Sequence, residues 1–81
     1  MEIYSTADCL PESTPATVVS VALPQALTQR LTDLGLLPGT KLLRTLTAPS
    51  GSPIAFSFRG SVVALRSQDA QFIRCKWEVR S

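Results

Sequence analysis

The chain has 81 residues, of which 44% are hydrophobic and 17% are charged, and its formal net charge is +2. This length predicts a single domain with a small core. Because the sequence contains no histidine, catalysis by a Ser-His or Cys-His pair and metal sites built on imidazole are excluded. Six prolines and four glycines indicate many turns, which favours short strands over a bundle of helices.

Charge is distributed unevenly along the chain. Residues 1–29 contain three acidic residues and no lysine or arginine, whereas residues 30–81 contain eight basic and three acidic residues, a net charge of +5. The second part can attract an acidic partner. It lacks the dense basic stripe of a nucleic-acid-binding protein, so a solvated surface is the preferred interpretation and no nucleic-acid partner is expected.

Residues 1–16 are predicted to form an N-terminal arm or linker, and residues 17–81 the folded domain. Between Ser5 and Ala16 the sequence is polar and carries two prolines, which is typical of a segment that is poorly ordered unless it packs against the domain. The β-branched run at 17–23 predicts the first strand.

Residues 24–35 are predicted to form a helix. Pro24 suits the first turn, because the N–H that proline lacks would have no partner there. The helix has one apolar stripe, made of three leucines at i, i+4 and i+7: Leu27, Leu31 and Leu34.

A rigid turn is expected directly after this helix. Gly35 lies where a helix C-terminus favours the left-handed conformation, and Leu36 then lies where a Schellman motif makes its apolar contact with Leu31. Pro38 and Gly39 fit the two central positions of a type II turn, which favours proline first and glycine second.

Two interpretations of this turn stay open. The preferred one is scaffold geometry alone, with Gly35 and Gly39 as structural turn residues. In the other, Leu37 and Pro38, with Leu36 before them, are held out as a rigid apolar contact for a partner.

Residues 41–48 and 54–58 are predicted to form the next two strands. The first alternates imperfectly, with Leu42, Arg44 and Leu46 on one face, which indicates a β-bulge. The second alternates cleanly and directs its isoleucine and both phenylalanines inward.

A tight turn at Arg59 and Gly60 is expected to lead into a strand at 61–66. That strand is apolar on both faces, as in a central or barrel strand. Ser67 is expected to cap a short helix that follows it at 68–74.

The last strand is predicted at residues 75–80 from its strict alternation. Its inward residues are Cys75, Trp77 and Val79, and its outward residues are Lys76, Glu78 and Arg80. About five strands and two short helices, without a regular βαβ order, predict a mainly antiparallel sheet. In so small a chain, a partly closed barrel protects the sheet edges best.

No catalytic residue, metal site or cofactor is expected. The acidic residues are scattered, no glycine-rich phosphate loop is present, and Cys9 and Cys75 lie far apart without a CxxC partner. Cys75 is interpreted as buried apolar filler. The sequence therefore predicts a binding module and not an enzyme.

Three motifs follow one another between Arg30 and Arg74. They are Leu-Gly-Leu-Leu-Pro-Gly at 34–39, Ala-Pro-Ser-Gly-Ser-Pro-Ile at 48–54 and Ala-Leu-Arg at 64–66. In order and spacing they resemble the FeoA family of small ferrous iron transport proteins. The resemblance implies an SH3-like small β-barrel of about five strands and two short helices, without agreed catalytic or iron-binding residues.

The resemblance also implies a partner and a place in the cell. The family works in the bacterial cytoplasm, at the inner face of the cell membrane, beside the ferrous iron transporter FeoB, whose cytosolic part carries a GTPase domain. Docking on that cytosolic part is the expected role, without insertion into the membrane. Two features depart from the family pattern: Arg44 replaces an apolar inward residue, and the segment 5–16 is longer and richer in proline.

Three other functions were compatible with a small barrel. They are an SH3-like adaptor for peptides, a metalloregulator-type barrel domain of the kind found in iron-dependent repressors, and a nucleic-acid binder. Few aromatic residues are available to line a groove for proline-rich peptides, which disfavours the adaptor. Exposed barrel edges are compatible with a homodimer.

Overall fold

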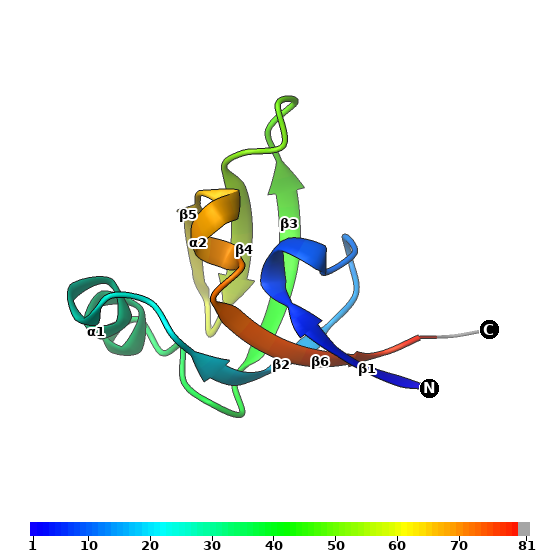
Figure 1. The fold of residues 1–81 in the computed structure, drawn as a ribbon, viewed down its shortest axis with the longest axis horizontal. Helices are drawn as coiled ribbons and strands as arrows, with labels where there is room; N and C mark the ends of the chain where they lie inside the picture. The colour runs from blue at the N-terminus through cyan, green and yellow to red at the C-terminus, as the bar shows by residue number, and fades with distance from the viewer. Residues whose placement is uncertain (80–81) are drawn as a thin grey trace.

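The computed structural model describes residues 1–79 and shows a strongly bent, six-stranded antiparallel sheet with short helices at its margins (Figure 1). The elements in chain order are β1 (Glu2–Thr6), the 3₁₀ helix η1 (Ala7–Cys9), β2 (Ala16–Val21), α1 (Gln25–Asp33), β3 (Lys41–Thr47), β4 (Ile54–Phe58), β5 (Ser61–Leu65), α2 (Ser67–Ala70) and β6 (Ile73–Glu78). The predicted mainly-β fold with two short helices is confirmed, with six strands in place of about five.

The strand order is β1-β6-β2-β3-β4-β5, so β1 and β5 are the two edges. The strands β1, β6 and β2 cross the strands β3, β4 and β5 (Figure 1). The strands β2 and β3 join the two groups through two paired positions. The core fills the space between the groups. Its largest fully buried side chains are Phe56, Leu10, Leu36, Leu42, Ile54, Ile73, Val18 and Cys75.

The N-terminal segment is part of the sheet and of the core. β1 pairs with β6 along its whole length, and Ala7 and Leu10 are fully buried. Arg44, half-buried on β3, donates from Nη1 to the carbonyl oxygens of Leu10 at 2.9 Å and Asp8 at 3.3 Å. The predicted arm is thus packed against the sheet over residues 5–10, because long-range pairing and the Arg44 guanidinium hold this polar segment in place.

The helix α1 ends as predicted. Gly35 has φ +106°, its N–H donates to Thr32 O at 2.9 Å, and the N–H of Leu36 donates to Leu31 O at 2.8 Å. These two bonds define a Schellman motif. The type II turn is also confirmed, because Thr40 N–H donates to Leu37 O at 2.9 Å and Gly39 has φ +93°.

A bulge interrupts β3, as its imperfect alternation predicts. The register against β4 shifts between Arg44 and Leu46, so that Arg44 lies opposite Phe56 and Leu46 opposite Ala55. The shift turns Leu46 outward, where it is 67% exposed. Placing Leu46 on the face of Leu42 was wrong, because the bulge reverses the alternation within the strand.

Two expectations for the region after β4 were wrong. Of the two alternatives for this strand, central or barrel strand, the central one is wrong, because β5 is an edge strand of the sheet and Val62 on its outer face is 68% exposed. The helix α2 has Arg66 at its N-cap instead of Ser67. Ser67 is the first helical residue, and its N–H donates to Ser52 Oγ at 3.1 Å. The turn at Arg59 and Gly60 is as predicted, with φ +49° and +78°.

The strand β6 lies inside the sheet, between β1 and β2. Cys75 and Trp77 are buried as predicted. Val79 is 39% exposed, because it follows the end of the strand, so its inward placement was wrong. Arg80, expected on the outer face, lies outside the described residues.

Candidate functional site

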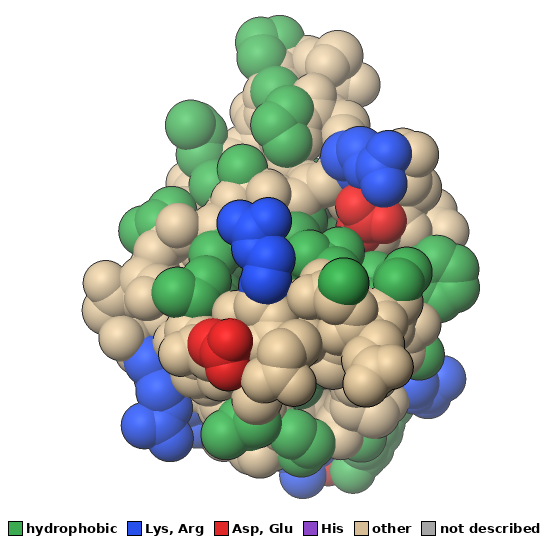
Figure 2. All heavy atoms as spheres, turned by 90° about the vertical axis from the view of Figure 1, so that its left-hand side faces the viewer, with side chains coloured by type: hydrophobic (Ala, Val, Ile, Leu, Met, Phe, Trp, Pro, Cys, Tyr) green, Lys and Arg blue, Asp and Glu red, His purple; other side chains and the backbone are tan. Residues whose placement is uncertain are grey.

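The candidate site is an apolar groove between α1 and the edge strand β5, with a volume of about 390 Å³. It is lined by Leu27, Arg30, Leu31, Leu34, Val62, Val63, Ala64 and Leu65. Figure 2 shows this side of the molecule, where hydrophobic side chains are spread over the surface, with a basic side chain among them and further charged side chains around them. We call this feature the α1–β5 groove.

The helix contributes one wall of the α1–β5 groove. Its predicted apolar stripe is only partly covered: Leu31 is buried at 2% exposure, Leu27 is half-buried, and Leu34 is 43% exposed. Arg30 is the only charged residue of the lining. The exposure of Leu34 was not predicted, because the spacing of the stripe shows which residues share a face but not how much of that face the sheet covers.

The strand β5 contributes the other wall. Val62 and Ala64 are exposed on its outer face, whereas Leu65 on its inner face is buried. In the sequence, the sign of an exposed apolar surface here is that β5 has apolar residues on both faces. Because the same pattern is typical of a central or barrel strand, the exposure of Val62 was not predicted.

The turn after α1 presents a second apolar feature. Leu37, at 43% exposure, and Pro38 are exposed, as the docking hypothesis requires. Leu36 is only 2% exposed, so its side chain cannot contact a partner. Its place in a candidate contact surface was therefore wrong, since the Schellman motif directs it into the core.

A buried threonine fixes the shape of this turn. Thr40 Oγ1 donates to Gly35 O at 2.9 Å and accepts from Leu37 N–H at 3.0 Å. The N–H of Gly39 donates to Val18 O at 2.7 Å, which fastens the turn to β2. Thr40 is 5% exposed. Its role was not predicted, because a lone threonine before a strand carries no distinctive pattern.

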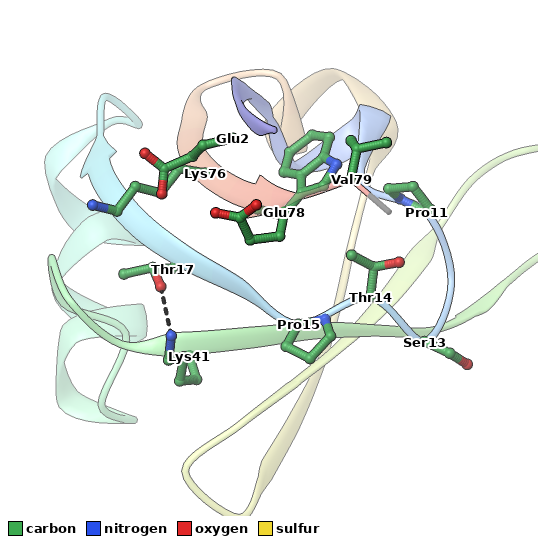
Figure 3. A pocket seen from close by; sticks show the side chains of 11 residues that line it. Glu2, Pro11, Ser13, Thr14, Pro15, Thr17, Lys41, Lys76, Glu78 and Val79 are labelled. Carbon is green, nitrogen blue, oxygen red and sulfur yellow. Dashed lines mark hydrogen bonds between the residues drawn. The ribbon is translucent and has the colours of Figure 1, made fainter. Parts of the chain in front are cut away.

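A larger hollow of about 730 Å³ lies on another part of the surface, between the loop after η1 and the ends of β1 and β6 (Figure 3). It is lined by Glu2, Pro11, Ser13, Thr14, Pro15, Thr17, Lys41, Lys76, Trp77, Glu78 and Val79. Its charged groups are of both signs and several are already engaged. Lys41 Nζ donates to Thr17 Oγ1 at 2.9 Å, and Glu78 pairs with the N-terminal amine at 3.3 Å. We find no convergent set of groups there for one class of ligand.

The two cysteines differ in their surroundings. Both are free thiols, Cys9 exposed and Cys75 buried. Burial, together with the smaller effects of the nearby Asp8 and Cys9, raises the pKa of Cys75 to about 11. Cys75 is therefore a protonated thiol at neutral pH. Within residues 1–79, no three His, Cys, Asp or Glu side chains are grouped to hold a metal ion.

The described part of the chain has no helix with the length and apolar character that a membrane span requires.

Comparison with known proteins places the chain among small iron-transport proteins. A family model described as the FeoA domain matches residues 7–76. The chain is similar to the FeoA protein from Chlorobium tepidum, with 34% identity, 91% of this chain and 70% of that chain covered, and a TM-score of 0.86. No protein with a curated description matches the chain.

Two further structures extend the comparison. FeoA from Stenotrophomonas maltophilia, described as a prokaryotic SH3 domain protein complexed with zinc, is 29% identical, with 84% of this chain and 85% of that chain covered and a TM-score of 0.72. A manganese-dependent transcriptional repressor is 14% identical over 96% of this chain and 44% of its own, with a TM-score of 0.79, which shows a shared fold alone. The SH3-like fold is thus confirmed.

Proposed function

Because the chain belongs to the FeoA family of ferrous iron transport accessory proteins, we propose that it docks on the cytosolic part of a FeoB-type transporter. The docking surface consists of the α1–β5 groove together with the exposed turn residues Leu37 and Pro38. This function places the protein in the cytoplasm, at the inner face of the cell membrane.

The observation that carries the proposal is the exposure of large apolar side chains on structurally fixed elements. Leu34 and Leu37 are each 43% exposed, and Val62 is 68% exposed. The backbone of Leu37 is held by its hydrogen bonds with Thr40 and by a type II turn, so little backbone entropy is lost when a partner covers this residue. Apolar residues that are exposed and already ordered are typical anchors of protein interfaces.

The aromatic residues argue against an adaptor for proline-rich peptides. Such grooves are lined by several aromatic side chains. Phe56, Phe58 and Trp77 are buried here, while Tyr4 and Phe72 are exposed on other elements and do not line the α1–β5 groove. A nucleic-acid binder would need exposed aromatic side chains among basic ones, and the groove contains one arginine and no aromatic residue.

The proposal is tested by titrating the cytosolic domain of a FeoB-type transporter with three glutamine variants. Leu34→Gln and Leu37→Gln should each weaken binding by about tenfold or more, as expected for interface anchors. Their free energies of unfolding should change by less than about 0.5 kcal/mol, because both side chains are substantially exposed.

Leu46→Gln is the matched control. Leu46 is 67% exposed on the β3–β4 hairpin and does not line the groove, so this variant should bind like the wild type. Wild-type affinity in the Leu34 and Leu37 variants would contradict the proposed surface. Equal weakening in all three variants would indicate a general apolar effect and would contradict it as well.

A further inference from the structure

We propose that β5 is a docking edge, to which an extended segment of the partner adds as a further antiparallel or parallel strand. The apolar side chains of that segment then fill the α1–β5 groove. This inference rests on the proposed function and names the way in which the partner is recognised. Addition of a strand to an exposed edge supplies affinity through backbone hydrogen bonds and specificity through side-chain pockets.

The backbone of β5 has unused hydrogen-bonding groups on one side. Phe58 pairs with Ser61 across the two-residue turn, and the register continues without a shift to Ile54 and Leu65. In such a hairpin every second residue bonds to the neighbouring strand, so Ser61, Val63 and Leu65 bond to β4. The N–H and C=O groups of Val62 and Ala64 point away from β4. Among the described residues, neither one forms a backbone hydrogen bond outside the sheet.

The edge at β5 also lacks the features that normally prevent strand addition. Natural edges are protected by charged residues, prolines, bulges or a covering element. The strand β5 has the sequence SVVAL, with no charge, no proline and no register shift against β4. The opposite edge, β1, carries Glu2, and the N-terminal amine lies at its start in a salt bridge with Glu78. Protection is therefore present at one edge and missing at the edge beside the groove.

Charge indicates the chemistry of the occupant. Arg30 is exposed and is the only charged residue of the groove lining. Arg59 is exposed in the β4–β5 turn, and its Cδ lies 2.8 Å from the place where a Cβ on Gly35 would be, so its side chain lies over the end of α1. We therefore expect an extended apolar segment with a carboxylate nearby. A second copy of this chain would bring its own arginines to the same surface, which disfavours edge-to-edge pairing of two copies.

Amide hydrogen exchange tests the docking edge directly. In the free protein, the amides of Val62 and Ala64 should exchange at least tenfold faster than those of Val63 and Leu65, measured by NMR. Addition of the FeoB-type cytosolic domain should slow exchange at Val62 and Ala64 by at least tenfold. Binding without this protection would overturn the docking edge and leave the proposed function standing.

A peptide probe separates the two proposals. The probe is a hexapeptide of alternating valine and threonine ending in glutamate, and its control carries N-methyl groups on alternate residues. Protection of the Val62 and Ala64 amides by the probe but not by the control supports the docking edge. This holds even if the cytosolic domain does not bind. Failure of the domain to bind would overturn the proposed function alone. If neither the probe nor the cytosolic domain protects these amides, the docking edge is wrong. Protection that rises with protein concentration alone would assign the edge to a second copy and overturn the proposed occupant.

A pair of variants tests the same edge by affinity. Val62→Pro removes the outward N–H, a change that edge strands tolerate, and should weaken binding of the cytosolic domain by about tenfold. Val62→Thr keeps the N–H and the branched shape and should weaken it by less than threefold. Equal affinities in two folded variants, as judged by thermal melting, would contradict the docking edge. If the proline variant does not fold, the exchange experiment decides.

Discussion

Gly35 determines the direction of the chain between α1 and β3. Its φ of +106° lies in the left-handed region, and its N–H and that of Leu36 complete the Schellman motif. A Cβ at this position would lie 2.8 Å from Arg59 Cδ, so a side chain meets both backbone strain and a close neighbour. Gly39 shares the positive φ, but a Cβ there would meet nothing within 4 Å. A substitution at Gly39 therefore introduces backbone strain alone, whereas one at Gly35 introduces backbone strain and a steric contact with Arg59.

We expect Gly39→Ala to lower the free energy of unfolding by about 1–2 kcal/mol, the cost of a left-handed conformation for an L-residue. Gly35→Ala should cost more than this, because Arg59 must also move. Chemical denaturation of both variants measures the difference. If Gly35→Ala lowers the free energy of unfolding by the same amount or less, the Arg59 side chain moves without cost and backbone strain alone determines the loss at both positions.

Cys75 should make stability depend on pH in the alkaline range. The unfolded chain releases the thiol proton near the ordinary value of 9.0, whereas burial raises the pKa of the folded thiol to about 11. Between these values the unfolded state binds fewer protons, so stability that is fully present below pH 9 falls as the pH rises towards 11.

The expected loss is about 2 kcal/mol between these limits. Cys75→Ala removes this component and leaves the other side chains of the protein unchanged. The measurement is the free energy of unfolding from pH 8 to about pH 11. A Cys75→Ala variant whose stability falls as steeply as that of the wild type would contradict the assigned cause.

At the scale of elements, the N-terminal strand is joined to the sheet at two places. β1 pairs with β6, and the segment after it is held by the Arg44 guanidinium, which bonds to the carbonyls of Asp8 and Leu10 and to Thr47 Oγ1 at 2.8 Å. The Glu12 backbone also forms an isolated bridge with Arg44. Arg44 and the segment after β1 are thus parts of one arrangement.

Arg44→Met should lower the free energy of unfolding by about 1–3 kcal/mol, because buried carbonyl oxygens lose charged donors. The effect should be local: amides of β1 and η1 should exchange faster than in the wild type, while those of β4 change little. Hydrogen exchange followed by residue measures this contrast. A uniform increase over the whole sheet would show that Arg44 stabilises the core in general and does not fasten this segment.

The elements that were predictable from the sequence are those whose chemistry is local. The cap at Gly35, the type II turn and the alternation of β4 all follow from residues within a few positions of one another. The pairing of β1 with β6 joins residues such as Ile3 and Trp77 at opposite ends of the chain. No local pattern distinguishes such a strand from a polar arm, so the sixth strand and the role of Arg44 were missed.

At the scale of the whole molecule, the bent sheet has two distinct ends. One edge, β1, is charged, and the other, β5, is apolar and borders the α1–β5 groove. The sequence indicated the apolar turn at Leu37 and Pro38 but not the neighbouring groove. The exposure of Leu34 and Val62 depends on the strand order, which follows from long-range packing and not from periodicity.

The central claim, docking through this apolar end on a FeoB-type cytosolic domain, is tested most directly by mapping the interface on the ¹⁵N-labelled protein. We expect backbone amide shift changes on adding the unlabelled domain to fall on α1, residues 36–39 and β5, and to be small on β1 and the β3–β4 hairpin. Changes that gather on β1 or the hairpin, or no change at saturating concentration of the domain, would contradict the account.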